Sequence, residues 1–333
     1  MHVVFSNEDN FLQLWKSLFE KVDHQCPLYL PLGIEYQKEY CSDITFTDLS
    51  FVIAEKNNPI LGIIMSLDQK KDGYTELSGF GRPIIYLEAN DISFQLLKGA
   101  RRKLKTIFEK NLNAHQVMKV VYKDFLPKDN LSFFGNYLLA SGASTYPFFT
   151  QIIELSLTES RLHSSLRKSY QSLINWGKKN MEINILDNET IKYDDIESFR
   201  RLHILSAGRE TRSKKTWETQ YEMVNNEEAF VITGEYENKL VTAAMFLRSP
   251  KLCYYGISAS RKELFDKPIS HVIIWNAILH AKKLGCHYFE MGEQFFTNQG
   301  ESLPTKKELG ISTFKKGFGG KTKVFLIISN LYD

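Results

Sequence analysis

The run Gly310-Ile311-Ser312-Thr313-Phe314-Lys315-Lys316-Gly317-Phe318-Gly319-Gly320-Lys321 sets two aromatic residues and two adjacent lysines between glycines, and the strand-like run 324–328 follows it. Glycine is favoured where the backbone needs a positive φ or passes close to another group. A lysine ammonium suits a phosphate or an oxyanion. The stretch therefore predicts a basic loop, held by Phe314 and Phe318, that binds an anionic ligand. The alternative is an ordinary helix-to-strand turn with solvated lysines.

Charge is unevenly distributed along the rest of the chain. Residues 1–157 carry 16 lysines and arginines against 18 aspartates and glutamates, a net charge of −2, whereas residues 158–333 carry 26 against 21, a net charge of +5. This excess favours anionic ligands in the second half, but it is too small to indicate general nucleic-acid binding. A length of 333 residues predicts two domains, which we expect to be 1–157 and 158–333.

Several classes of protein are not indicated. The cysteines are isolated in the sequence, so neither a zinc site nor a disulfide framework is expected, and we predict no bound metal. No apolar run has the length of a membrane-spanning helix. The N-terminal residues lack the basic and apolar regions of a signal peptide. We therefore expect a cytoplasmic protein.

A hairpin pattern occurs twice in the chain. Phe51-Val52-Ile53-Ala54 begins the first copy and Phe230-Val231-Ile232-Thr233 the second, and after each turn apolar residues return in the same spacing. A strand, a helix and a strand then follow in both halves. The sequence therefore predicts two copies of one α/β unit, which pack on each other or on a shared ligand. The alternative is chance, because hairpins resemble one another.

Two arginines and two further polar or aromatic residues lie close together after a predicted helix over 193–206. Arg209 and Arg212 flank a glutamate, and Trp217 and Gln220 come about one turn later. Arginine binds carboxylate or phosphate through two parallel hydrogen bonds, so this segment predicts part of a substrate-binding rim. The alternative is a surface cluster of ion pairs, which contributes little.

The second α/β copy carries candidate catalytic residues. Tyr255 lies on its predicted strand 252–257, whose edge can hydrogen-bond a peptide-like donor. His271 lies on the next helix, and we assign both to substrate binding, although a lone histidine is often structural. Glu290 and Glu293 end the following strand, where a carboxylate can orient or deprotonate an attacking amine. An ion pair with Lys315 is the alternative role for either glutamate.

Two of these segments carry a family resemblance. The motif W-N-A-I-L-H-A-K-K-L-G-C-H-Y-F-E-M-G over 275–292, followed by G-I-S-T-F-K-K-G-F-G-G over 310–320, resembles the FemAB-like aminoacyltransferases and their relatives among the GNAT-superfamily acyltransferases. The resemblance implies an α/β fold of mixed sheets, built as two tandem GNAT-like domains with the active site in the second. The match is best over about residues 150–333, and the first copy matches by topology.

The resemblance also implies a reaction. An activated acyl group, from aminoacyl-tRNA or an acyl-CoA, is transferred to an amine of a cell-envelope precursor such as a peptidoglycan peptide or an amino sugar. Phe314 and Lys315 match the family's F-K pair at the acyl-transfer pocket, so Lys315 is expected to stabilise the developing oxyanion or hold a donor phosphate. Arg209 or Arg212 takes the place of an arginine that contacts the acceptor's diphosphate in some members. The acceptor amine is expected in a cleft between the two copies.

The sequence departs from the family pattern in two places. No heptad run corresponds to the coiled-coil arm of the longer members. The loop 261–266 lacks the glycines that cradle the CoA pyrophosphate in GNAT enzymes. The second departure favours aminoacyl-tRNA as the donor, although a net charge of +3 promises little nonspecific affinity for RNA.

Two rival functions remain open. One is an acyl-CoA-dependent N-acyltransferase that acts on an amino sugar of a surface polysaccharide. The other is a catalytically silent tandem domain that binds RNA or an anionic polymer, and the predicted basic helix over 158–180 motivates it. Salt-dependent RNA binding without any amide product would distinguish the last from both enzymes.

Overall fold

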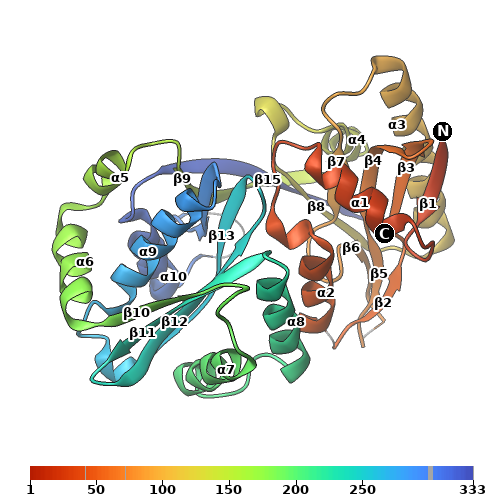
Figure 1. Ribbon diagram of the computed structural model, residues 1–333. Helices are drawn as coiled ribbons and strands as arrows, with labels where there is room; N and C mark the ends of the chain where they lie inside the picture. Colours follow the sequence, from red (N-terminus) through yellow and green to blue (C-terminus); the bar gives the residue numbers. More distant parts are fainter. Residues whose placement is uncertain (42, 72, 299–302, 333) are drawn as a thin grey trace. The chain divides into compact units, whose positions relative to one another are not determined.

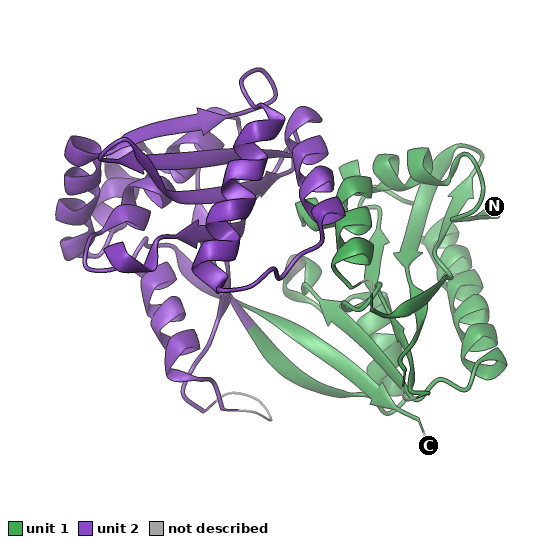
Figure 2. Cartoon of the chain, turned by 90° about the horizontal axis from the view of Figure 1, so that it is seen from below, with its two compact units in different colours: residues 1–148, 324–333 green, residues 149–323 purple. Residues whose placement is uncertain are grey.

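A computed structural model describes residues 1–41, 43–71, 73–298 and 303–332. The chain divides into two compact units, and each is a mixed α/β structure (Figure 1). Unit 1 comprises residues 1–148 and 324–333, and unit 2 comprises residues 149–323 (Figure 2). The border that the sequence placed near residue 157 lies inside unit 2, and the last residues, expected in the second domain, belong to unit 1.

Unit 1 contains two sheets, with strand orders β1-β3-β4-β7 and β15-β8-β6-β5-β2. The β3–β4 hairpin that the sequence predicted is present, and β4 continues beyond Met65 into β5 of the other sheet. Its elements are β1 (His2–Phe5), α1 (Phe11–Glu20), α2 (Pro31–Tyr40), β2 (Thr45–Asp48), β3 (Phe51–Glu55), β4 (Asn58–Ile64), β5 (Ser66–Gln69), β6 (Thr75–Ser78), β7 (Ile85–Glu88), α3 (Phe94–Ala114), β8 (Lys119–Asp124), α4 (Phe133–Ala140) and the first part of β9 (Ser144–Glu154).

Unit 2 contains one sheet in the order β10-β11-β12-β13-β14-β9. Helices α6 and α9 cover one face of it, and α7 and α8 cover the other (Figure 1). Its elements are α5 (Glu159–Ser165), α6 (Lys168–Asn180), β10 (Glu182–Leu186), α7 (Tyr193–Ala207), α8 (Lys214–Asn225), β11 (Ala229–Tyr236), β12 (Lys239–Arg248), β13 (Leu252–Ser260), α9 (Ile269–Lys283), β14 (Tyr288–Gln294), α10 (Lys306–Lys316) and the first part of β15 (Lys321–Leu331).

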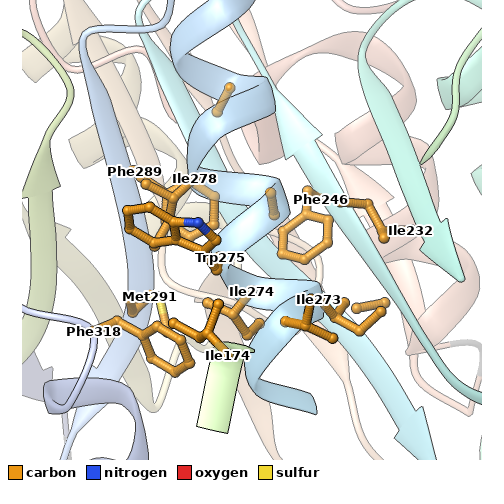
Figure 3. Packing of buried hydrophobic residues seen from close by; sticks show 14 of the residues in the cluster. Ile174, Ile232, Phe246, Ile273, Ile274, Trp275, Ile278, Phe289, Met291 and Phe318 are labelled. Atoms are coloured by element: carbon orange, nitrogen blue, oxygen red, sulfur yellow. The ribbon is translucent and has the colours of Figure 1, made fainter. Parts of the chain in front are cut away.

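The core of unit 2 forms around α9, whose apolar residues are nearly continuous. Trp275 of this helix is 1% exposed and packs among side chains of the sheet and of α6. Figure 3 shows Trp275 beside Phe289, with Ile174 and Phe318 at the other end of the cluster. Burying such side chains removes apolar surface from water, the main force that stabilises the unit. The core thereby fixes α9 against β12, β13 and β14.

The last strand of each repeat pairs in the other unit. Residues 149–154 of β9, which follow the helices of the first repeat, pair with β14 in unit 2. Residues 326–331 of β15, which end the second repeat, pair with β8 in unit 1. Each unit therefore takes one strand from the other repeat, which explains why its bounds differ from a simple division of the chain.

The predicted helix over 158–180 is two helices. Leu166 and Arg167, between α5 and α6, have extended backbone, and the N–H of Arg167 donates to the carbonyl oxygen of Gly317 at 2.8 Å. No proline or glycine marks the break, so the periodicity of the sequence gave no signal for it. The physical cause is this hydrogen bond to the end of α10, which a continuous helix would exclude.

Candidate functional site

Two parallel strands of unit 2 separate after a short shared register. β13 pairs with β14 from Leu252 to Tyr254 on one strand and from Tyr288 to Glu290 on the other. Beyond that point β13 continues along β12, whereas β14 continues along β9, and both pairings contain a register shift at this level. Strand edges that leave a ladder carry backbone groups able to hydrogen-bond a ligand.

Lys315 reaches β14 just beyond this point. Its ammonium donates a hydrogen bond of 3.3 Å to the carbonyl oxygen of Glu293. Gly292 has a φ of +82°, and a Cβ atom there would lie 3.3 Å from Nζ of Lys315. Glycine is therefore needed both for the backbone conformation and for the close approach of the ammonium. Lys315 also lies in the last turn of α10, where the helix dipole favours a cation.

Two carboxylates accompany this ammonium. Glu290 is only 4% exposed and accepts a hydrogen bond of 2.8 Å from the hydroxyl of Thr150 on β9. Burial lowers the pKa of Lys315, and the negative charges of Glu293 and Glu290 partly oppose that shift. The structure thus brings together the three residues that the sequence assigned to catalysis. It also supplies Thr150, which sequence reasoning missed because it lies on a strand of the first repeat.

Tyr254, rather than the predicted Tyr255, lies at this place. Its hydroxyl oxygen would be 3.5 Å from a Cβ atom on Gly292. Side chains alternate along a strand, and Tyr255 points the other way, stacking on Phe246 with ring centroids 5.5 Å apart and donating to Ser258 at 2.7 Å. Burial raises the pKa of Tyr255. The alternation in the sequence was the available signal, since Cys253 and Tyr255 share the apolar face.

Phe314 and His271 meet in an aromatic cluster, which also contains Tyr170 and Phe318. The ring centroids of His271 lie 4.5 Å from Tyr170 and 5.2 Å from Phe314. Burial lowers the pKa of His271 to about 4, so the ring is neutral at neutral pH. His271 therefore contributes an uncharged, half-buried imidazole to the packing around the end of α10.

The start of α6 holds the last turn of α10. The guanidinium of Arg167 donates to the carbonyl oxygen of Thr313 at 3.0 Å, and the hydroxyl of Tyr170 donates to that of Phe314 at 3.2 Å. Both carbonyls lie in the last turn of α10, where carbonyl groups lack the regular helical partners, and that of Phe314 also accepts from the N–H of Gly317 at 3.1 Å. A Cβ atom on Gly317 would collide with the ring of Tyr170. The glycine-rich turn thus serves close packing, and residues 306–316 before it are helical rather than a loop.

The predicted arginine cluster lies at the junction of α7 and α8. Arg212 approaches Nε2 of His203 at 3.0 Å and donates to the hydroxyl of Thr211 at 3.2 Å. Burial, and to a lesser extent the Arg212 cation, lowers the pKa of His203. Arg209 is exposed. Arg212 is therefore positioned by its neighbours, whereas Arg209 extends from the segment between the helices.

Trp217 and Gln220 are enclosed rather than exposed at a rim. Trp217 is 2% exposed and packs edge-on against Phe199 of α7, with ring centroids 5.2 Å apart. Gln220 is 1% exposed, and within the described residues neither polar atom of its amide has a hydrogen-bond partner. Trp217 therefore has a structural role in the packing of α8 against α7. The buried amide carries a cost of about 1–3 kcal/mol for each unsatisfied group.

The described residues contain neither a cluster of metal ligands nor a membrane-spanning helix. Among them, no three histidine, cysteine, aspartate or glutamate side chains come together in a way that could hold a metal ion. Within the same part of the chain, no helix combines the length and the apolar character that crossing a membrane requires.

No protein-family model and no curated protein sequence matches this chain. Solved structures do match it. FemX aligns with a TM-score of 0.72 at 12% identity, over 100% of this chain and 98% of that chain. L-PGS from Bacillus licheniformis aligns with a TM-score of 0.59 at 13% identity, over 95% and 90%. A tandem GNAT protein from the clavulanic acid biosynthesis pathway aligns with a TM-score of 0.54 at 11% identity, over 99% and 97%. The chain therefore has the FemAB-like fold of two tandem GNAT-like units, which confirms the predicted fold class.

Proposed function

We propose that this protein is an acyltransferase that forms an amide bond, and that the transfer takes place beside Lys315. The observation that carries this proposal is the half-buried ammonium where β13 and β14 separate, with Glu290 and Glu293 next to it. The fold shared with FemX and with a tandem GNAT protein supports it. So does the resemblance of the segments 275–292 and 310–320 to FemAB-like aminoacyltransferases.

The chemistry follows from the groups present. The neutral amine of the acceptor attacks the carbonyl carbon of the donor, and the carbonyl oxygen becomes negative. The ammonium of Lys315 donates a hydrogen bond to that oxygen. The intermediate collapses to the amide as the carbon–oxygen or carbon–sulfur bond to the donor breaks. The proton lost by the amine passes to Glu290 or Glu293 and then to the leaving oxygen or sulfur. Alignment of the two reactants supplies much of the remaining acceleration.

We favour aminoacyl-tRNA as the donor and an amine of a cell-envelope precursor as the acceptor, in the cytoplasm. The segment between β13 and α9 contains no glycine, and Arg261 within it is engaged with Glu263 and with the carbonyl oxygen of Leu240. A pyrophosphate cradle needs free backbone N–H groups at close approach. Arg212 is the candidate contact for a diphosphate of the acceptor.

A second candidate function is acyl-CoA-dependent N-acylation of an amino sugar. The observation that favours it is the TM-score of 0.54 to the tandem GNAT protein, whose structure is described as one without AcCoA. The two candidates differ in the donor, so calorimetry with CoA and with charged tRNA separates them. Tight binding of CoA supports the second.

The experiment offers the protein charged tRNA or acyl-CoA together with envelope-precursor mixtures and detects amide products by mass spectrometry. Replacing Lys315 with Ala should lower turnover about 10²–10³-fold, because one oxyanion donor is lost. Lys316→Ala is the matched control, since this neighbouring lysine of the same helix is exposed. If no donor gives an amide product, the proposal that the protein is an acyltransferase is wrong. Equal turnover by the two variants would remove Lys315 from the mechanism.

A further inference from the structure

Helix α3 of unit 1 carries a concentration of positive charge that the proposed reaction does not use. Its residues include six cations and one carboxylate, Glu109, a net charge of 6 − 1 = +5. The sequence of unit 1 as a whole has 16 lysines and arginines against 18 aspartates and glutamates, a net charge of −2. The positive charge is therefore a local property of this helix, in a unit that is otherwise acidic.

The apolar face of α3 is buried in unit 1, whereas the opposite face is exposed to solvent. Ala100, Leu104 and Phe108 are fully buried in the core of unit 1, so the helix cannot turn its apolar face outward. Arg101 is half-buried and forms an ion pair of 2.7 Å with Glu88. The remaining cations are exposed, and they are Lys98, Arg102, Lys103, Lys105 and Lys110.

The helix itself carries little negative charge to neutralise this exposed face. Glu109 is the only carboxylate of the helix and lies 3.7 Å from Lys105, a pair at four-residue spacing whose members are each about half exposed. Such exposed pairs are weak. Asp91, the next acid toward the N-terminus, precedes the helix. The cations from Lys98 to Lys110 extend over about 18 Å of helix. They form a positive surface around the solvent-exposed half of the helix.

An exposed aromatic residue begins the same helix. Phe94 is 74% exposed, among the most exposed large hydrophobic residues of the described chain. An apolar ring at the edge of a row of lysines matches the boundary of an anionic bilayer, where rings enter the acyl region and ammonium groups contact headgroups. A nucleic-acid duplex would account for the cations and leave the phenylalanine unexplained.

We infer that the outer face of α3, defined by Phe94, Lys98, Arg102, Lys103, Lys105 and Lys110, docks unit 1 on the surface of an anionic lipid bilayer. Charge complementarity selects this occupant: each lysine or arginine near such a surface strengthens binding about fivefold, and the attraction falls as salt rises. The helix lies on the surface and does not insert. This docking is independent of the transfer reaction, so each can fail without the other.

The test measures sedimentation of the full chain with vesicles of phosphatidylcholine mixed with phosphatidylglycerol, and of phosphatidylcholine alone. The wild-type protein should bind the mixed vesicles at low salt and not the neutral ones. The triple variant Lys98→Gln/Arg102→Gln/Lys105→Gln should bind about 100-fold more weakly. Phe94→Ser should bind about tenfold more weakly without changing the salt dependence.

A matched control removes the same charge elsewhere. Lys178, Lys179 and Lys239 are exposed residues of unit 2, and their triple replacement by Gln should change the affinity less than about threefold. Circular dichroism verifies that each variant is folded, and Phe94→Ser keeps the test valid if the triple variant is not. The inference is overturned if the wild type does not bind mixed vesicles, if both triple variants lose equal affinity, or if Phe94→Ser binds like the wild type. Binding of a model RNA duplex through α3, without vesicle binding, would assign the face to nucleic acid instead.

Discussion

Among the described residues, each unit has one pair of parallel strands, β13 and β14 in unit 2 and β6 and β8 in unit 1, and the two pairings end in different ways. In unit 2, the pairing of β13 with β14 ends at Tyr254 and Glu290, and the strands go to different neighbours. In unit 1, β6 pairs with β8 through Leu77 and Val120, loops out, and returns at Ile84, whose N–H donates to the carbonyl oxygen of Val121 at 2.8 Å. The first junction is left open for a side chain, and the second is closed by backbone.

A buried network holds the closing loop of unit 1. Asp68 is 2% exposed and accepts from the hydroxyl of Ser66 at 2.5 Å, from the N–H of Gly81 at 2.9 Å and from the hydroxyl of Ser78. Burial raises the pKa of Asp68, and these hydrogen bonds oppose the shift. Unit 2 has charged groups at the corresponding place, whereas unit 1 uses its carboxylate to fix a turn.

The register shows which residues correspond. Lys315 lies six residues before β15 (321 − 315), and Leu138, a fully buried leucine of unit 1, lies six residues before β9 (144 − 138). Thr150 pairs with Glu293, and the corresponding Ile327 pairs with Lys123. The difference teaches that one fold can hold either a packed core or a cation at this position. By this count, unit 2 carries Lys315 and Glu293 where unit 1 carries Leu138 and Lys123.

Exchanging the two side chains should produce the largest effect. Leu138→Lys buries a charge without a partner, and we expect it to lower the free energy of unfolding by about 3–5 kcal/mol. Lys315→Leu removes a partly buried charge and should change the free energy of unfolding by less than about 1 kcal/mol, while lowering turnover about 10²–10³-fold. Urea denaturation of both variants measures this. Equal destabilisation would show that the two positions do not differ as described.

Loosening the support of Lys315 should have a smaller effect, confined to unit 2. Tyr170→Phe removes the hydrogen bond to the carbonyl oxygen of Phe314 and keeps the ring against Gly317. We expect kcat to fall about fivefold, the value of one hydrogen bond. Tyr193→Phe on α7 is the control, because that tyrosine is exposed. If the two variants have the same kcat, Tyr170 does not position the lysine.

The carboxylates of unit 2 should set the alkaline limit of activity. The protonated form of Lys315 is the one that donates to an oxyanion, so activity should be lost as pH rises through its lowered pKa. Glu293→Gln removes a charge that supports the ammonium and should move this limit to lower pH by about half a unit. The pH profile of kcat measures the shift. Glu263→Gln, on an exposed loop, should leave the profile in place.

The aromatic cluster should give the smallest effect, seen in stability. The pKa of His271 is about 4 in the folded protein against 6.5 ordinarily, so unfolded chains bind a proton that folded ones do not. The contribution of the neutral His271 to the free energy of unfolding is therefore complete above about pH 6.5. It is lost as pH falls toward 4, with a slope below about 1.4 kcal/mol per pH unit. His271→Phe should flatten this part of the stability curve. Replacing the exposed His287 with Gln should not.

The sequence was sufficient to predict the repeated unit and part of the candidate site. Hairpin periodicity identified both copies, and the order of strand, helix and strand placed Glu290 and Lys315 in the same unit. The exchange of β9 and β15 was not predictable, because strand pairing between repeats leaves no local pattern. The capping box of Thr305 and Glu308 was a local signal for α10, although Gly310 weakens a helix prediction.

Side-chain direction was the other missing information. Tyr254 and Tyr255 are neighbours in sequence and lie on opposite faces of β13, so choosing between them required the burial of the flanking residues. Trp217 suited a ligand rim by composition and is enclosed by α7 instead. The distinction depends on long-range packing that no spacing encodes.

The central claim, that unit 2 holds a desolvated ammonium where its strands separate, can be tested without any substrate. Competitive labelling with an amine reagent across a pH range, read at residue 315 by mass spectrometry, gives the pKa of this side chain. A midpoint below the ordinary lysine value of 10.5, falling further in Glu293→Gln, is the predicted result. A midpoint at or above that value, unchanged by the substitution, would contradict the account.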